Sequence, residues 1–207
     1  MQPPAEKRVT VAFVPREQFA TTQRCLEILL ERTSEPYELI VVDGGSPPAL
    51  QQYLQTAALD HGFMLLRSEE YLTPNQARNL ALPHVQTSYV AFVDNDVLVS
   101  EGWLTALVEC AERSGAWVVG PIYFEFEPEG QRIHMFGGEL SIKTDERGRT
   151  TCVEKHLFAH ELLSDVQTGF HAQPTELIEF HTVLIRMEAF QLIGRLDEGF
   201  QATSEHV

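Results

Sequence analysis

Short apolar runs alternate with longer amphipathic segments through the first 120 residues, and this rhythm constrains the fold more than any other feature. The amphipathic segments repeat apolar residues at helical spacing, whereas the short runs are rich in β-branched residues. Strands are expected at Val9–Val14, Leu39–Val42, Phe63–Leu66, Tyr89–Val93 and from Trp117 to Val119. Helices are expected between them at Phe19–Arg32, Pro48–His61, Asn75–Leu82 and Glu101–Arg113.

Strands that are apolar on both faces and separated by helices belong to a mostly parallel sheet that is covered on both sides. The sequence therefore predicts the α/β class, as a three-layer α/β/α sandwich. In such a sheet the ligand crevice lies at the carboxyl ends of the strands. Polar residues follow the predicted strands at this edge, in Pro15–Glu17, Asp43–Ser46 and Asp94–Asp96.

The alternation of predicted strands and helices ends after residue 120. The charged, glycine-containing stretch Glu125–Arg149 predicts a hairpin, with Gly137-Gly138 and Gly148 as turn candidates. A strand is expected again at Leu177–Ile185, followed by a short helix over Met187–Ile193 that ends at Gly194. We predict one domain over residues 1–207, with a nucleotide-sugar-binding half at about 8–120 and an acceptor-side half at about 121–207.

Charge and cysteine content limit the possible partners and compartment. The sequence contains 15 Lys and Arg and 30 Asp and Glu, which gives a net charge of −15. A nucleic acid or an anionic membrane needs a basic surface, so neither is expected as a partner. An acidic chain suits a bound cation, but acidity more often serves solubility alone. No apolar run approaches a transmembrane segment, and three cysteines without metal-like spacing favour a reducing compartment. We expect a cytoplasmic location, with the inner face of a membrane as an alternative.

The segment Phe92-Val93-Asp94-Asn95-Asp96 is the most specific indication of a functional site in the sequence. Side chains alternate along extended chain, so Asp94 and Asp96 project to the same side. Such carboxylates bind hard divalent cations, which in turn bind phosphates. The alternative is that both aspartates only cap a helix or form a turn.

Two further polar segments are candidates for ligand contacts. In Asp43-Gly44-Gly45-Ser46 the glycines allow a ligand close to the backbone, and Asp43 can accept hydrogen bonds from a base or ribose. The alternative is a plain turn, with Ser46 as N-cap and Pro47 as the first helical residue. Arg78, one turn into a helix, either reaches a pyrophosphate or nucleobase or lies on a solvated helix face.

Taken in order, these motifs resemble the inverting glycosyltransferases of family 2, which have the nucleotide-diphosphosugar-binding GT-A fold. The resemblance includes VVDGGS at 41–46, NQARN at 75–79, FVDND at 92–96, and LIRMEAF and IGRLDEGF at 184–190 and 193–200. It implies that donor-binding residues are Pro15, Glu17, Asp43, Gly45, Arg78, Asp94 and Asn95. It further implies that Asp96 holds Mn²⁺ or Mg²⁺, and that Glu205 or His206 is the catalytic base.

This chain departs from the family pattern at two places. Gly44 stands where the first loop usually carries a second acid, and His206 stands where an aspartate is common. The sequence also stops at Val207, inside what resembles the start of a helix, so the acceptor-side half is expected to be truncated. A histidine at position 206 can still take a proton near neutral pH or bind metal.

The function expected from these features is metal-assisted, inverting transfer of a sugar to an acceptor hydroxyl. A UDP-sugar is the expected donor, and the acceptor is a carbohydrate or another hydroxyl compound. One alternative is a sugar nucleotidyltransferase, although Pro15–Gln18 lacks the glycine-rich loop of those enzymes. The other is a non-catalytic nucleotide-sugar-binding module. His156 and His160 are spaced for one helix face and suggest either a metal site or solvated side chains.

Overall fold

The computed structural model describes residues 6–15, 18–125, 131–166 and 170–199. It divides into two compact units, which are described separately. The first comprises the described residues of 6–119 and 180–199, and the second comprises the described residues of 120–179.

The first unit is built on a six-stranded sheet with the order β3-β2-β1-β4-β10-β5. Its strands are β1 Val9–Val14, β2 Tyr37–Gly44, β3 Met64–Ser68, β4 Tyr89–Asp94, β5 Val118–Val119 and β10 Thr182–Arg186. Strands β3, β2, β1 and β4 run parallel, and β10 runs antiparallel to both β4 and β5. The predicted mostly parallel sheet is confirmed.

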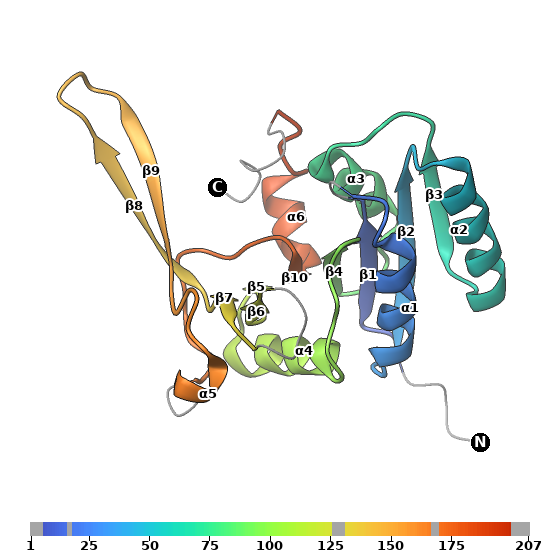
Figure 1. Ribbon diagram of the computed structural model, residues 1–207, viewed down its shortest axis with the longest axis horizontal. Helices are drawn as coiled ribbons and strands as arrows, with labels where there is room; N and C mark the ends of the chain where they lie inside the picture. Colours follow the sequence, from blue (N-terminus) through green and yellow to red (C-terminus); the bar gives the residue numbers. More distant parts are fainter. Residues whose placement is uncertain (1–5, 16–17, 126–130, 167–169, 200–207) are drawn as a thin grey trace. The chain divides into compact units, whose positions relative to one another are not determined.

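Helices cover both faces of this sheet, as the two-sided apolar strands require. They are α1 Thr22–Arg32, α2 Pro48–His61, α3 Pro74–Ala81, α4 Trp103–Ser114 and α6 Met187–Ile193, with the 3₁₀ turn Leu82–His84 after α3 (Figure 1). Phe13 and Val93 lie in a core with residues of α1 and α4, such as Leu29 and Leu107. On the other face Phe92 packs edge-to-face against Phe190 of α6, with ring centroids 6.3 Å apart.

Local sequence signals explain the start of α3. Thr73 accepts a hydrogen bond from the Gln76 backbone and the Gln76 side chain accepts one from Thr73 N–H, so a complete capping box precedes the helix. The helix α2 begins at Pro48 with Pro47 as its N-cap, one residue later than the turn interpretation of Ser46 placed it. The Ser46 N–H instead donates to Asp43, which closes the turn before the helix.

The second unit contains two antiparallel strand pairs. The first pair is β6 Tyr123–Phe124 with β7 Ile133–Met135, and the second is the hairpin of β8 Gly138–Thr144 with β9 Thr150–His156. A short helix, α5, spans Leu163–Val166. Tyr123, Met135 and Leu177 form a buried apolar cluster. Figure 1 shows the long hairpin of β8 and β9.

The hairpin turns at Gly148, where φ is +74°, and not at Gly137-Gly138. The Asp145 carboxylate accepts the backbone N–H groups of Arg147 and Arg149 and, at 2.7 Å, the Arg149 Nε–H. These bonds, chiefly those from Arg149, lower the pKa of Asp145. The acid therefore stabilises the turn in its ionised form.

Two expectations for this part of the chain are wrong. Leu177 does not begin the last strand; it forms an isolated bridge with Gly138, and β10 starts at Thr182. His156 and His160 do not share a helix face, because His156 ends β9 and His160 follows with φ +68°. Among the described residues, no helix is long and apolar enough to cross a membrane.

Candidate nucleotide and metal site

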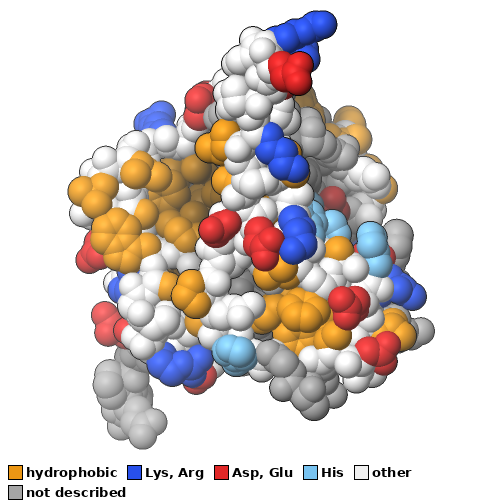
Figure 2. Space-filling view, turned by 90° about the vertical axis from the view of Figure 1, so that its left-hand side faces the viewer, with side chains coloured by type: hydrophobic (Ala, Val, Ile, Leu, Met, Phe, Trp, Pro, Cys, Tyr) orange, Lys and Arg blue, Asp and Glu red, His pale blue; other side chains and the backbone are white. Residues whose placement is uncertain are grey.

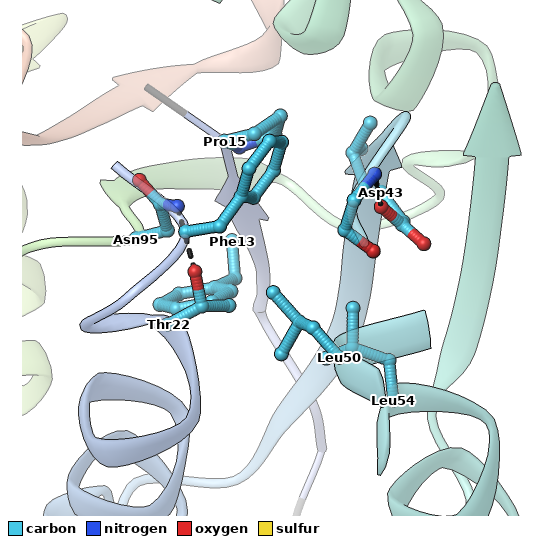
Figure 3. Close-up of a pocket in the computed structure, with 10 residues that line it drawn as sticks. Phe13, Pro15, Thr22, Asp43, Leu50, Leu54 and Asn95 are labelled. Atoms are coloured by element: carbon cyan, nitrogen blue, oxygen red, sulfur yellow. Dashed lines mark hydrogen bonds between the residues drawn. The ribbon is translucent and has the colours of Figure 1, made fainter. Parts of the chain in front are cut away.

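The carboxyl ends of β1, β2 and β4 meet at one edge of the sheet, because these strands are parallel and in register. A small pocket opens there in the first unit (Figure 3). Its lining consists of Phe13, Pro15, Phe19, Thr22, Val42, Asp43, Ser46, Leu50, Leu54 and Asn95. The walls are largely apolar and the polar groups are few, and the hollow, at about 10 Å³, has room for about one water molecule.

Asp43 is a buried acid whose two oxygens are both engaged. Oδ1 accepts the Ser46 N–H at 3.0 Å, and Oδ2 accepts from Arg67 Nη1 at 2.5 Å. Arg67 lies directly across from Asp43 in the β2–β3 register. Hydrogen bonds, first to Glu69 and then to Asp43, raise the pKa of Arg67. Arg67 was not among the predicted site residues, because only the pairing of β2 with β3 brings it to Asp43.

The two glycines after Asp43 lie where larger residues do not fit. A Cβ atom on Gly44 would lie 3.1 Å from Pro15 Cγ and 3.2 Å from both Leu72 Cβ and Leu72 N. Gly45 has φ +74°, and its Cβ would lie 3.0 Å from the Glu70 carbonyl carbon. Tight packing against the loop after β3 thus explains why this chain carries glycine where an acid is usual.

Arg78 and Asp94 form an ion pair with no solvent-exposed side-chain surface on either partner. The distance from Arg78 Nη2 to Asp94 Oδ1 is 2.9 Å. Arg78 also donates to Asn75 Oδ1 at 3.1 Å and lies over the Phe180 ring, 4.9 Å from its centroid. The interpretation of Arg78 as a solvated helix residue is therefore wrong. Its guanidinium orients the first acid of the Asp-Asn-Asp segment.

Asp94, Asp96 and His181 bring three potential metal ligands together, with all ligand atoms within 4.8 Å of one another. Asp94 Oδ2 lies 3.4 Å from His181 Nδ1, and Asp96 is solvent-exposed. Carboxylate oxygens and an imidazole nitrogen suit a divalent ion such as Mn²⁺. The predicted metal ligand Asp96 is thus part of a chemically suitable set. His181 was not predicted. The sequence feature that could have identified it is its position directly before an apolar strand.

Strand β4 ends at Asp94, and Asn95 and Asp96 form a turn in which the Val97 N–H donates to the Asp94 carbonyl at 3.2 Å, so the expected extended chain does not reach Asp96. The Asn95 side chain is directed to the start of α1. Its amide nitrogen donates to Gln18 O at 2.9 Å and to Thr22 Oγ1 at 2.8 Å (Figure 3). It therefore ties the end of β4 to the start of α1 and also lines the pocket. Three predicted site residues, Glu17, Glu205 and His206, lie outside the described residues.

Two asparagines of α3 hold the segment that carries the second half of the family resemblance. Asn79 Nδ2 donates to the Leu196 carbonyl and to Glu198, both at 2.8 Å, and Asn79 Oδ1 accepts the Leu196 N–H at 3.0 Å. Asn75 Nδ2 donates to the Asp197 carbonyl at 2.8 Å. The helix whose Arg78 pairs with Asp94 thus also fixes residues 196–198.

Residues 14–162 match the family described as glycosyl transferase family 2. This match covers most of the chain, which therefore belongs to glycosyltransferase family 2. The fold agrees with the structure of TarS residues 1–349 from S. aureus, with a TM-score of 0.58, 14% identity, and coverage of 96% of this chain and 53% of that one. That likeness concerns the fold alone.

Two curated relatives are similar over the first part of the chain. The succinoglycan biosynthesis protein ExoM of Rhizobium meliloti (strain 1021) is 29% identical over 126 residues, which are 60% of this chain and 41% of the relative. The glycosyltransferase GlyG of Streptococcus pneumoniae serotype 4 is 24% identical over 113 residues, 54% of this chain and 38% of the relative. The aligned parts thus cover only about two fifths of each relative's length.

Proposed function

We propose that this chain carries the donor site of a glycosyltransferase that moves a sugar from a nucleoside-diphosphate sugar to an acceptor hydroxyl, with inversion. The observation that carries the proposal is the Asp94, Asp96 and His181 group beside an apolar pocket, in a family 2 fold. ExoM, by its name, acts in succinoglycan biosynthesis, which favours a polysaccharide-building role here too.

The nucleobase would lie against the mouth of this pocket, where Pro15 and Asp43 border it. Asp43 would accept a base or ribose donor with the remaining lone pairs of its carboxylate, since its position is already set by Ser46 and Arg67. Gly45 would let the ligand approach the backbone at the turn. UDP is the proposed nucleotide, because it is the usual one in proteins that this sequence resembles.

Asp96, Asp94 and His181 would hold Mn²⁺ or Mg²⁺, and the bound ion would offset charge that develops on the departing diphosphate. Arg78 would act through Asp94, since its buried guanidinium faces that carboxylate rather than solvent. This arrangement presets the ligand orientation before the donor arrives. Glu205 or His206 would take the proton of the acceptor hydroxyl, as the family resemblance implies.

Calorimetric titration with UDP, GDP and their sugar conjugates, each with and without Mn²⁺, tests the donor site. We expect metal-dependent micromolar binding of a UDP compound, lost in Asp96→Ala and weakened at least tenfold in His181→Gln. Asp60→Ala, an exposed acid on α2, is the matched control and should bind like the unmodified chain. Absence of binding by every nucleotide would refute the proposal.

A non-catalytic binding module is the second candidate, because Gly44 and His206 both depart from the pattern of active family members. A transfer assay distinguishes the binding module from the transferase. It measures release of the nucleoside diphosphate in the presence of candidate acceptors. Binding without release, in a chain extended past Val207, would favour the binding module. Release that disappears in Asp96→Ala would favour the transferase.

A further inference from the structure

Ser46 lies in the turn that leads from β2 into α2, and its hydroxyl does not cap the helix. Helix α2 starts at Pro48, and its N-cap is Pro47, which has no side-chain hydrogen bond to offer. The Ser46 backbone N–H donates to Asp43 Oδ1 at 3.0 Å. The backbone of Ser46 thus closes the turn, and its side chain is left without the capping role that serine often has before a helix.

The Ser46 hydroxyl is both buried and unpaired. Ser46 is 5% exposed, and among the residues that the structure describes no group forms a hydrogen bond with its Oγ atom. Most buried polar side-chain atoms in proteins have a hydrogen-bond partner, because an unpaired one destabilises the folded chain. This hydroxyl therefore calls for a partner from outside the polypeptide.

Ser46 belongs to the wall of the small pocket at the carboxyl edge of the sheet, together with Asp43 (Figure 3). The hollow has room for about one water-sized group. A hydroxyl or carbonyl oxygen of a ligand is of that size, whereas a nucleobase ring is larger. A serine hydroxyl can donate one hydrogen bond and accept others, so it can pair with either kind of oxygen.

We propose that the Ser46 hydroxyl is a polar contact for the bound nucleotide, made to one ribose hydroxyl or one carbonyl oxygen of the base that enters the hollow. This contact depends on the proposed function, because it needs a nucleotide at the mouth of the pocket. The two parts of Ser46 then have separate roles. Its N–H orients the Asp43 carboxylate, and its Oγ atom meets the ligand.

Ser46→Ala isolates the hydroxyl, since alanine keeps the backbone N–H that donates to Asp43. Calorimetric titration of the full chain with UDP and Mn²⁺ measures the affinity, and denaturant unfolding measures the stability. We expect Ser46→Ala to weaken UDP binding about three- to tenfold, because one hydrogen bond is lost. The unfolding midpoint should be unchanged or higher, because the substitution removes an unpaired buried polar atom.

Ser34→Ala, at an exposed serine before β2, is the matched control and should leave both the affinity and the midpoint unchanged. Unchanged UDP affinity in Ser46→Ala, while the unmodified chain binds UDP, would overturn the proposed contact alone. A loss of affinity together with a lower unfolding midpoint would assign the hydroxyl a structural role and overturn it as well. If the unmodified chain binds no nucleotide, the proposed function fails and this contact fails with it.

Nucleotide analogues identify the oxygen that Ser46 contacts. The compounds 2′-deoxy-UDP and 3′-deoxy-UDP each lack one ribose hydroxyl, and 2-thio-UDP and 4-thio-UDP each carry sulfur in place of one carbonyl oxygen of the base. With the analogue that lacks the contacted oxygen, Ser46→Ala should cause no further loss of affinity. An equal further loss with every analogue would contradict the proposed contact.

Discussion

Arg78 of α3 and Asp94 at the end of β4 form a fully buried ion pair, with 2.9 Å between Nη2 and Oδ1. The pair joins α3 to the strand that ends in the Asp-Asn-Asp segment. The Phe180 ring, which precedes β10, packs against the Arg78 guanidinium. A charge buried in this way is tolerated only when it is paired and hydrogen-bonded. The orientation of Asp94, a candidate metal ligand, thus depends on a residue that is itself out of solvent.

Replacement of Arg78 by leucine should destabilise the chain by about 3–5 kcal/mol, because it leaves the Asp94 carboxylate buried without its partner. Denaturant unfolding monitored by circular dichroism measures this change. The exposed Arg113→Gln on α4 is the control and should stay within about 0.5 kcal/mol. A loss below about 1 kcal/mol for Arg78→Leu would show that Asp94 does not depend on the pair.

Gly44→Asp, which restores the acid usual at this position, should weaken rather than improve the site. Its Cβ would lie 3.2 Å from the backbone nitrogen of Leu72, so the loop after β3 must move. Overpacking of this kind costs about 1–3 kcal/mol. Unfolding and nucleotide titration are measured together; tighter nucleotide binding with unchanged stability would contradict the packing argument.

Asn79→Ala should release the segment of residues 196–198, because three hydrogen bonds end on this one side chain. Leu196 is half-buried and Glu198 exposed, so water can replace part of what is lost, and each bond contributes about 0.5–1.5 kcal/mol. Limited proteolysis with mass spectrometry should show faster cleavage at this segment. Gln55→Ala, on the exposed side of α2, serves as the control. Identical cleavage in both variants would disprove the anchoring role.

Cys25 should resist alkylation in the folded chain. It is buried, and burial chiefly raises the pKa of its thiol from 9.0 to about 11, so little of the reactive thiolate exists at pH 8. Cys152 is exposed and should react first. Mass spectrometry of iodoacetamide adducts, with and without denaturant, follows both. Modification of Cys25 as fast as Cys152 in native buffer would refute the expected protection.

Much of the fold follows from local pattern. The runs that form β1, β2 and β4 are apolar on both faces, so the sequence alone requires helices on both sides of a parallel sheet. The carboxyl-end rule then predicts that Asp43 and Asp94 share one edge. Helix α2 agrees with its predicted limits, Pro48–His61, because proline and glycine mark its ends. A hairpin was predicted too, and its turn lies at Gly148, one of the two turn candidates, although its strands span 138–156 rather than the predicted 125–149.

The local pattern of the sequence was thus enough for the α/β sandwich, the sheet edge that carries the candidate site, and the acids that lie there. The side chains that contact these acids and histidines were set by the tertiary structure. Arg67 beside Asp43, Arg78 beneath Asp94, His181 beside Asp96 and His156 beside His134 are brought together by strand order and register. These contacts join residues far apart in the chain, and periodicity carries only local information. A buried charge and a solvated one look the same in the sequence, since only packing decides which of them loses its water.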